Sequence, residues 1–456
     1  MLPPPPPRSP GPASELLAEL CDALAGRPEF RGAAPVLADM AQQCRQPLRV
    51  AVTGDVSTGK STLVNALLGR DLAKVERRET TARVTWYRHP GLPPGAPLGD
   101  GHEYAAVPFR LADRIVLADT PGVNTDSAHE QVTDAMLRGA TAAAGSATVL
   151  LYLCHKTVSA GAKERIDQFS RLAAGELGSG FNVVLVGAKA DEGGVGPAAI
   201  TANLEREAGL LGTRAVTVIQ ELAVVARIGA LRPGHLDTLR IIAADRELGE
   251  DYAPSGWDML RLGWGTRGYD RGALDAMWRL ASTTYAVVRS LPAVGSGSVA
   301  SVADLASLWE ELSGLAALEG LLERLADESD VLTVHAVTGR LRRLGGDLGH
   351  VRTGMIRAGL DRLRKDPSFA RLDLRAAAMV LETQLFSDVA ADERDEAVRM
   401  LRGPQLTQGA PEMARRWRRR AAQRGRSAFA RHIAEVVADA ALGDTYRHTV
   451  GTSRNV

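Results

Sequence analysis

Residues 54–61 of the chain read Gly-Asp-Val-Ser-Thr-Gly-Lys-Ser, and this stretch decides the fold. Its spacing fits the G-x-x-x-x-G-K-[ST] phosphate loop. The apolar run at residues 48–53 predicts a strand before the loop, and residues 62–68 predict a helix after it. The two glycines let the backbone turn its N–H groups toward phosphate oxygens, and the helix N-terminus adds partial positive charge. The stretch therefore predicts a nucleotide-binding α/β domain rather than a chance glycine-rich turn.

The loop supplies most of the predicted nucleotide contacts. These are the nine consecutive residues Gly54, Asp55, Val56, Ser57, Thr58, Gly59, Lys60, Ser61 and Thr62. Lys60 is predicted to reach the β- and γ-phosphates, and the Ser61 hydroxyl is predicted to ligate Mg²⁺. Lysine occurs at only six positions of the chain, so a lysine at this motif position carries weight.

Composition and charge are ordinary for a globular protein. At 456 residues, the chain is long enough for two to three domains. Its net charge of +1 gives no sign of a nucleic-acid partner, and none is expected. Cys21, Cys44 and Cys154 lack metal-ligand spacing and are expected to be reduced thiols, as in a cytosolic protein. No segment approaches the length of uninterrupted apolar sequence that a transmembrane helix needs, so any membrane contact is expected to be peripheral.

Apolar runs alternate with helical patterns up to about residue 232. They predict strands at residues 48–53, 83–87, 114–118, 148–153, 182–187 and 214–219. This alternation is typical of a doubly wound, mostly parallel sheet. Residues 91–101 are rich in glycine and proline and are expected to form a surface loop.

Only helical patterns continue after residue 232, which predicts an elongated all-α bundle rather than a second α/β domain. Leucines recur at three- and four-residue steps from Leu305 to Leu344 and predict one long amphipathic helix or a helix pair. The patterns divide the chain into a disordered Pro-rich tail at 1–12, helices at 13–46, the nucleotide-binding domain at 47–232, the helical bundle at 233–442 and a flexible tail at 443–456.

Two further motifs indicate a Mg²⁺-dependent switch. A predicted strand ends in the D-x-x-G pattern at residues 119–122, where Asp119 would hold Mg²⁺ through its water shell and the Gly122 N–H would bond the γ-phosphate. Thr81 is the preferred first-switch ligand of Mg²⁺, with Thr80 second. The alternative is that both threonines begin an edge strand, which their β-propensity favours. The predicted metal ligands are therefore Ser61, Thr81 and Asp119.

The base-recognition motif is incomplete. Residues 187–191 match the N/T-K-x-D pattern only at Lys189 and Asp191. The Asp191 carboxylate can accept from guanine N1 and N2, a donor pair that adenine lacks, so GTP and GDP are predicted over ATP. Ala188 stands where Asn or Thr usually ties the base loop to the phosphate loop, so a modest affinity is expected. No Ser-Ala-like base loop is recognisable near Gln220.

The order of these motifs, with helices on both sides, resembles bacterial dynamin-like GTPases. Residues 79–89 look like the first switch segment of the actinobacterial branch, which includes the mycobacterial isoniazid-inducible dynamin-like proteins. Residues 313–318, 329–332 and 416–422 also look like that branch. The resemblance extends from about residue 14 to 440. It implies a GTPase head on a helical neck and trunk, with the first helices paired with late ones so that both termini lie near the head.

The resemblance also implies roles for single residues. Lys60, Ser57 and Thr81 would be the catalytic residues, and Ser57 matches a serine that places the catalytic water or a charge-compensating cation in other dynamins. Those proteins have Gln where this chain has Val56, and no Gln directly follows the D-x-x-G motif, so slow or partner-stimulated hydrolysis is expected. The predicted function is Mg²⁺-dependent GTP hydrolysis, coupled to homodimerisation of the heads and membrane remodelling on the inner face of the cytoplasmic membrane.

Two other functions stay open. One is a low-activity GTP-binding scaffold that regulates a larger, paired dynamin-like protein, which Ala188 and Val56 favour. The other is a soluble switch GTPase that acts on the ribosome or RNA and not on membranes, which the near-neutral charge and the lack of a recognisable RNA-binding module disfavour. Anionic membrane lipids are the expected peripheral partner. Candidate lipid contacts are the arginines at 340–357 and a basic cluster at 415–420, although a solvated helix face anchored by Trp417 explains the latter more simply.

Overall fold

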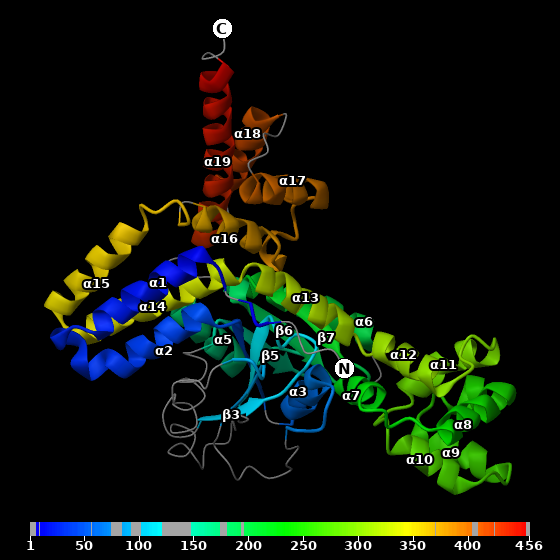
Figure 1. Ribbon diagram of the computed structural model, residues 1–456. Helices are drawn as coiled ribbons and strands as arrows, with labels where there is room; N and C mark the ends of the chain where they lie inside the picture. The colour runs from blue at the N-terminus through cyan, green and yellow to red at the C-terminus, as the bar shows by residue number, and fades with distance from the viewer. Residues whose placement is uncertain are drawn as a thin grey trace.

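The computed structural model describes residues 6–8, 10–55, 57–73, 84–92, 102–120, 147–173, 180–192, 196–369, 371–403, 409–423 and 425–452. It shows an α/β domain with three groups of helices around it (Figure 1). The expected fold class, a mostly parallel sheet followed by a helical second half, is confirmed.

A seven-stranded sheet forms the centre of the α/β domain. Its strands are β1 (Leu48–Gly54), β2 (Val84–Arg88), β3 (His102–Ala106), β4 (Ile115–Asp119), β5 (Val149–Cys154), β6 (Val183–Ala188) and β7 (Arg214–Val218). Their order across the sheet is β3-β2-β4-β1-β5-β6-β7. All neighbouring strands pair in parallel except β2 and β4, which run antiparallel.

The six strands expected from the sequence are present, and each is displaced by one residue at most. The strand β3 was not expected. Its sequence, His-Glu-Tyr-Ala-Ala, lacks the buried apolar run that marks the other strands, because it lies at the edge of the sheet and pairs with β2 alone.

Helices cover both faces of the sheet. They are α3 (Lys60–Leu68), α5 (Ala160–Ala173), α6 (Gly196–Leu211) and α7 (Gln220–Arg227), and a short 3₁₀ helix, η4 (Gly180–Asn182), leads into β6. Successive side chains of β1 alternate between two cores: Val50 and Val52 join one, while Ala51 joins the other. The first core includes α3, and the second includes α5 and α6, so the sheet is buried on both sides.

A four-helix group packs on one side of the α/β domain (Figure 1). It consists of α1 (Pro12–Ala25), α2 (Ala34–Arg45), α14 (Ser329–Leu348) and α15 (His350–Leu363), with η1 (Pro28–Ala33) between the first two. The backbone N–H and hydroxyl of Ser14 both donate to Asp330 Oδ1, at 2.8 and 2.7 Å. Arg49 of β1 and Arg340 of α14 donate to opposite oxygens of Asp39 in α2. The expected pairing of the first helices with later ones is therefore present.

A second group of helices extends sideways from the α/β domain, and we call residues 233–312 the lateral arm (Figure 1). It contains α8 (Pro233–Ala244), the π-helical turn η5 (Leu248–Tyr252), α9 (Trp257–Thr266), α10 (Arg271–Trp278), α11 (Tyr285–Gly295) and α12 (Val302–Leu312). Three tryptophans, Trp257, Trp264 and Trp309, are buried in it. Its core is continuous with the second core of the sheet.

The leucine series from Leu305 to Leu344 is not one helix or a pair but three: α12, α13 (Leu315–Asp327) and α14. The first break is at Gly314, whose φ is +74°. A Cβ there would lie 2.4 Å from the Thr217 carbonyl oxygen, so this close approach to β7 requires glycine. Across the described residues, no helix has both the length and the apolar character needed to cross a membrane.

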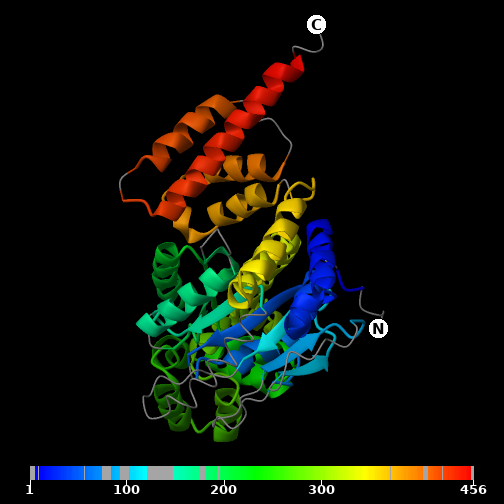
Figure 2. The ribbon, with the colours of Figure 1, turned by 90° about the vertical axis from the view of Figure 1, so that its left-hand side faces the viewer.

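The C-terminal helices form the third group, and the last of them points away from the sheet in both views (Figures 1 and 2). They are α16 (Leu372–Leu381), η6 (Gln384–Phe386), α17 (Ala391–Arg402), α18 (Ala410–Ala421) and α19 (Ala428–Thr452). The expectation that both termini lie near the head is therefore wrong for the C-terminal end. The helix α19 also continues past residue 442, where we expected a flexible tail.

Candidate nucleotide site

The phosphate loop connects β1 to α3 at the carboxyl edge of the sheet. Gly54 has a φ of +149°, and a Cβ on it would lie 2.3 Å from the Leu153 carbonyl oxygen of the neighbouring strand. Gly59, directly before α3, has a φ of +82°. Both positions therefore require glycine, one for a close approach of backbones and one for a left-handed conformation. Ser57 also has a positive φ, of 60°, which is uncommon for a residue with a side chain.

The ammonium group of Lys60 lies across this loop. Its Nζ donates to the Asp55 carbonyl oxygen at 2.7 Å and to the Gly54 carbonyl oxygen at 3.1 Å. The residue is only 8% exposed, although it is the first residue of α3. These contacts hold the positive charge at the phosphate loop, where it can meet the β- and γ-phosphates.

Ser61 and Asp119, two of the predicted metal ligands, are in direct contact. The Ser61 hydroxyl donates to Asp119 Oδ2 at 2.9 Å. The sheet brings them together because β1 and β4 are parallel neighbours, with Val52 opposite Asp119. The other carboxylate oxygen, Asp119 Oδ1, is buried and has no hydrogen-bond partner among the described residues. A buried carboxylate oxygen without a partner is suited to a cation or to one of its water ligands.

Burial raises the pKa of Asp119 to about 6, although the Ser61 hydrogen bond and the charge of Lys60 both act to lower it. Removing the carboxylate from water disfavours its charged form, and the nearby groups offset only part of that cost. A divalent cation at this carboxylate would stabilise the charged form. The electrostatics of the pair therefore agree with the geometry in fitting Mg²⁺.

Three of the predicted site residues, Val56, Thr81 and Gly122, lie outside the described residues, as does the alternative Thr80. Their predicted roles in the phosphate loop and in the two switches stay predictions. The described part of the phosphate site thus consists of Gly54, Asp55, Ser57, Thr58, Gly59, Lys60, Ser61, Thr62 and Asp119.

Asp55 has partners that the sequence did not suggest. Its Oδ1 accepts hydrogen bonds from the Tyr152 hydroxyl and from Arg165 Nη2, both at 2.9 Å. Arg165 Nη2 also donates to the Tyr152 hydroxyl at 2.6 Å. Tyr152 lies on β5 and Arg165 on α5, so the carboxylate is drawn toward these two elements and its charge is paired. This pairing lowers the repulsion that an acidic residue in a phosphate loop would otherwise exert on a polyphosphate.

The base loop follows β6 and keeps the two matching residues of the incomplete motif near the phosphate site. Lys189 has a φ of +54°, and its Nζ lies 3.2 Å from Glu192 Oε1. Asp191 Oδ2 accepts a hydrogen bond from the hydroxyl of Thr283, a residue of the lateral arm, at 2.7 Å. Ala188, the residue in the Asn or Thr position, is fully buried. The Asp191 carboxylate, which is predicted to contact the base, therefore accepts a hydrogen bond from a residue almost a hundred positions away in the sequence.

Gln220 connects the base loop to the phosphate loop. Its Oε1 accepts from the Lys189 N–H, and its Nε2 donates to the Thr58 carbonyl oxygen, both at 2.9 Å. The side chain is 2% exposed. The sequence pattern near Gln220 did not indicate this connection, because the parallel pairing of β6 with β7 is what brings the start of α7 to both loops.

Comparisons with known proteins agree with this geometry. A GTPase family described as "50S ribosome-binding GTPase" matches residues 49–185. The isoniazid-induced protein IniC of Mycobacterium tuberculosis, in strains CDC 1551 / Oshkosh and ATCC 25618 / H37Rv, is 27% identical over 453 residues, which cover 87% of this chain and 90% of that protein. The GTPase match and the similarity to IniC together support a bacterial dynamin-like GTPase. The similarity to IniC extends well beyond the GTPase motifs into the helical half.

Solved structures with similarity to this dynamin-like GTPase include bacterial dynamins. Two of them belong to an oligomerised bacterial dynamin pair described as a mechanism for the long-range sensing and tethering of membranes. One is 12% identical, with 81% of this chain and 78% of that chain covered and a TM-score of 0.28. The other is 13% identical, with 85% of this chain and 77% of that chain covered and a TM-score of 0.29. The LeoA bacterial dynamin GTPase from ETEC is 14% identical, with 88% of this chain and 59% of that chain covered and a TM-score of 0.25. Because these TM-scores are low, the family assignment rests on the GTPase match, the IniC relationship and the motifs.

The three described parts of the nucleotide site lie at one edge of the GTPase sheet. The phosphate loop follows β1, Asp119 ends β4, and the base loop follows β6, all at the carboxyl ends of parallel strands. This edge is where open α/β sheets bind their ligands. The residues predicted to contact phosphate, metal and base, as far as the structure describes them, therefore lie at one edge of the sheet.

Proposed function

We propose that this GTPase binds GTP with the residues at the carboxyl edge of the sheet, and that Mg²⁺ is held there by Ser61 and Asp119. The observation that supports this most is the 2.9 Å contact between Ser61 Oγ and Asp119 Oδ2, with the opposite carboxylate oxygen buried and unpartnered among the described residues. Lys60 lies at the same loop with its ammonium group directed at the loop carbonyls. When bound, Mg²⁺ would neutralise charge on the β–γ oxygens.

Guanine recognition is proposed for Asp191 and Lys189. Asp191 lies two residues after Lys189, whose backbone N–H donates to Gln220, and Oδ2 of its carboxylate already has one donor, Thr283. A carboxylate oxygen has two lone pairs, so the Thr283 bond leaves acceptor capacity for guanine N1 and N2. The alkyl stem of Lys189 would cover the base, as the motif implies.

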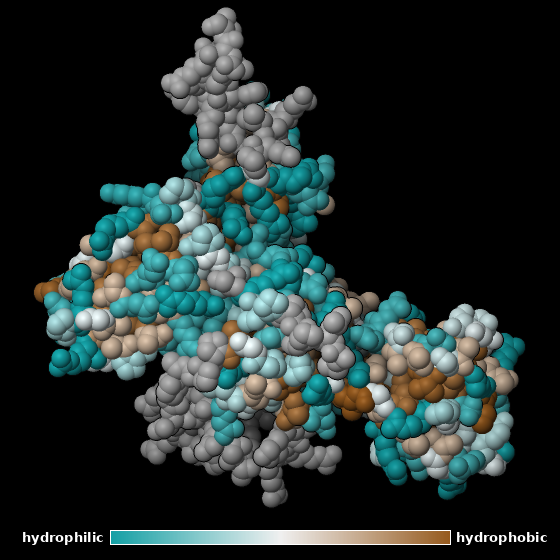
Figure 3. Space-filling view, viewed as in Figure 1, coloured by the Kyte–Doolittle hydropathy of each residue, from teal (hydrophilic) through white to brown (hydrophobic). Residues whose placement is uncertain are grey.

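Membrane contact is proposed for the lateral arm. Four of its large apolar side chains are exposed, at 42%, 57%, 37% and 44% for Met259, Leu262, Tyr269 and Trp278. Figure 3 shows apolar residues gathered on this arm. Arg261 lies over the Trp278 ring, 4.4 Å from its centroid, and its Nη2 is paired with Asp275 Oδ1 at 3.3 Å. The proposal therefore rests on the exposed apolar side chains, which suit insertion into a lipid interface.

Several of the basic residues predicted as lipid contacts form ion pairs within the chain. Arg416 and Arg420 pair with Glu396 and Glu393 of α17, while Trp417 is fully buried. Arg340 donates to Asp39 between α14 and α2. These contacts favour the simpler explanation of the cluster at 415–420. They also make the lateral arm a better lipid candidate than Arg340.

The wider proposal is a GTPase that works peripherally on the inner face of the cytoplasmic membrane and remodels it, with homodimerisation through its heads and a possible paired dynamin-like protein. The contact of Thr283 with Asp191 supports a coupling between the nucleotide and the helical half, since it joins the base loop to the lateral arm. A low-activity regulatory scaffold would have the same binding site and would differ in its turnover.

The test is GTP and ATP turnover with Mg²⁺ over a series of protein concentrations, with and without anionic liposomes. A specific activity that prefers GTP, rises with concentration and responds to lipid would support the proposal. Lys60→Ala should abolish turnover, whereas the exposed Lys365→Ala should not. Turnover that survives Lys60→Ala would reject the proposed site, and GTP binding with near-zero turnover would favour the scaffold.

A further inference from the structure

The unusual base motif leaves a structural problem that Gln220 answers. At Ala188 the chain has a methyl group, which cannot hydrogen bond, where an amide or hydroxyl usually ties the base loop to the phosphate loop. Ala188 is 0% exposed, and its side chain packs in the core of the sheet. The amide of Gln220 instead lies between the two loops, with one atom on each.

The orientation of this amide is fixed by its partners. The Lys189 N–H can only donate and therefore faces Oε1, while the Thr58 carbonyl can only accept and therefore faces Nε2. A Cβ on Gly59 would lie 3.2 Å from Gln220 Nε2, so the glycine also makes room for the amide to approach the loop. Because the oxygen and the nitrogen of this buried amide both have hydrogen-bond partners, the side chain is held in a single orientation.

We propose that Gln220, the first residue of α7, is the positioning residue of the guanine site. It makes the connection between the base loop and the phosphate loop that Ala188 cannot make. This inference rests on the proposed function of Lys189 and Asp191. By fixing the Lys189 N–H, Gln220 holds the start of the base loop in its left-handed conformation and sets Asp191 at a constant distance from the phosphate loop. A nucleotide spans both loops, so its affinity depends on their spacing.

A role in setting the spacing of the two loops and a purely structural role predict different effects on the binding of GDP and of pyrophosphate. Pyrophosphate contacts only the phosphate loop, whereas GDP contacts the phosphate loop and the base loop together. If Gln220 sets the spacing between them, its loss weakens GDP much more than pyrophosphate. If Gln220 only supports the phosphate loop, both ligands weaken equally.

The experiment is calorimetric titration of the full chain with GDP, ADP and pyrophosphate in the presence of Mg²⁺. Gln220→Met fills the same space without hydrogen bonds, and the exposed Gln168→Met on α5 is the matched control. Two neutral hydrogen bonds are lost, so GDP affinity should fall about tenfold or more in Gln220→Met, while pyrophosphate affinity should stay within about twofold. The preference for GDP over ADP should fall with it.

A GDP affinity that stays within about twofold of the unaltered protein, or equal losses for GDP and pyrophosphate, would overturn the proposal. If Gln220→Met does not fold, Gln220→Glu gives a second test, because its carboxylate can accept from Lys189 but cannot donate to Thr58. A folded Gln220→Glu with unchanged GDP affinity would likewise reject the role. If the unaltered protein shows no preference for GDP over ADP, the guanine site itself is wrong, which is a separate result.

Discussion

The hydroxyl of Thr283 donates a hydrogen bond to Oδ2 of Asp191, with 2.7 Å between the two oxygens. Thr283 lies in the lateral arm just before α11, and Asp191 is the carboxylate proposed to read guanine. One contact thus joins the base loop to the helical half of the chain. Any change in the position of the arm that breaks this bond changes the orientation of the carboxylate, and by linkage guanine binding must favour one arm position to the same extent.

Replacing Thr283 with valine should therefore weaken guanine binding without leaving a cavity in the lateral arm. Valine has nearly the same shape but no donor, and the loss of one hydrogen bond to a charged group is worth about 1.5–3 kcal/mol at most. We expect GDP affinity to fall several-fold and ADP affinity to stay unchanged in titration calorimetry. The matched control is Thr266→Val, which removes a hydroxyl bonded to the Gly263 carbonyl within the same arm. Equal effects of the two variants would contradict a specific role of Thr283.

Asp119→Asn should separate stability from function. The carboxylate is buried with one oxygen lacking a partner among the described residues, and burial raises its pKa to about 6. The charged carboxylate therefore lowers the free energy of unfolding of the magnesium-free protein at pH 7.5, by on the order of 3 kcal/mol for a shift of this size. We expect Asp119→Asn to raise the urea midpoint in EDTA while abolishing the stabilisation by Mg²⁺ with GDP. The exposed Asp258→Asn should do neither.

The pH dependence of that stability follows from the same shift. Because the pKa of Asp119 is higher in the folded chain than its ordinary value of 3.8, the folded state holds more protons between about pH 4 and pH 6. The contribution of Asp119 to stability is therefore fully present below pH 4 and is lost as the pH rises through 6. In EDTA, the difference in unfolding free energy between Asp119→Asn and the unaltered protein should grow from pH 5 to pH 7. A difference that does not change over this range would reject the raised pKa.

The sequence predicted those features whose signal is local. The buried strands are apolar runs of five to seven residues, and the phosphate loop is a contiguous pattern, so both were found with accurate bounds. The edge strand β3 has no such run and was missed. The leucine pattern continues through Gly314, but the helix ends there because the backbone passes close to the Thr217 carbonyl oxygen. Helical periodicity in the sequence does not reveal such a contact.

Contacts between distant residues could not be predicted in this way. Gln220 meets Thr58 across 162 positions and Asp191 meets Thr283 across 92. Each depends on which strands are neighbours and on where the lateral arm lies, and those are properties of the whole fold. Gln220 directly follows the strand predicted at residues 214–219, but its partner atoms are backbone groups, which carry no residue identity to recognise.

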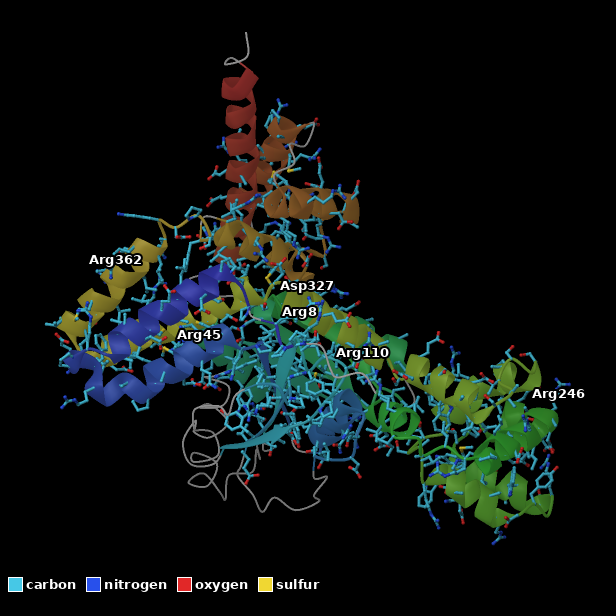
Figure 4. All side chains as sticks on the ribbon, in the orientation of Figure 1. Arg8, Arg45, Arg110, Arg246, Asp327 and Arg362 are labelled. Carbon is cyan, nitrogen blue, oxygen red and sulfur yellow. The ribbon has the colours of Figure 1, made fainter. Side chains whose placement is uncertain are left out.

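A buried charge cluster under the GTPase sheet should be important for stability. Glu319 of α13 is fully buried and accepts from Arg227 of α7, which also donates to Glu310 and to the Ala66 carbonyl oxygen near the end of α3. Arg110 donates to the same glutamate from the other side, and Figure 4 places it beside α13. The cluster therefore connects α3, the helix that follows the phosphate loop, to α7, α12 and α13.

Glu319→Gln should destabilise the protein strongly, by about 3 kcal/mol or more, because it leaves the mostly buried Arg227 with less compensation. Urea unfolding followed by circular dichroism measures this change. The comparison is Glu250→Gln in the exposed pair with Arg246, which Figure 4 shows at the outer end of the lateral arm. That variant should leave the midpoint where it is, because an exposed pair is screened by solvent. Similar midpoints for the two variants would show that the buried cluster does not stabilise the fold.

The apolar patch of the lateral arm should be needed for vesicle binding but not for basal turnover. Leu262 of α9 and Trp278 of α10 are 57% and 44% exposed, and Figure 1 shows these two helices in the lateral arm, apart from α3. Partial insertion of two such side chains into a lipid interface is worth roughly 1–2 kcal/mol, so Leu262→Gln with Trp278→Gln should lower the affinity for anionic vesicles about tenfold.

The control for this prediction is Leu210→Gln, which removes a side chain that is 79% exposed on α6 of the GTPase domain. Flotation with vesicles of phosphatidylglycerol and phosphatidylethanolamine measures the bound fraction, and GTP turnover without vesicles checks that the site is intact. Because insertion depends on apolar area rather than on charge alone, the difference between the double variant and the control should persist at high salt, where purely electrostatic binding is screened. Equal binding by both variants would place the lipid contact elsewhere on the chain, and loss of binding by Leu210→Gln alone would place it on the GTPase domain.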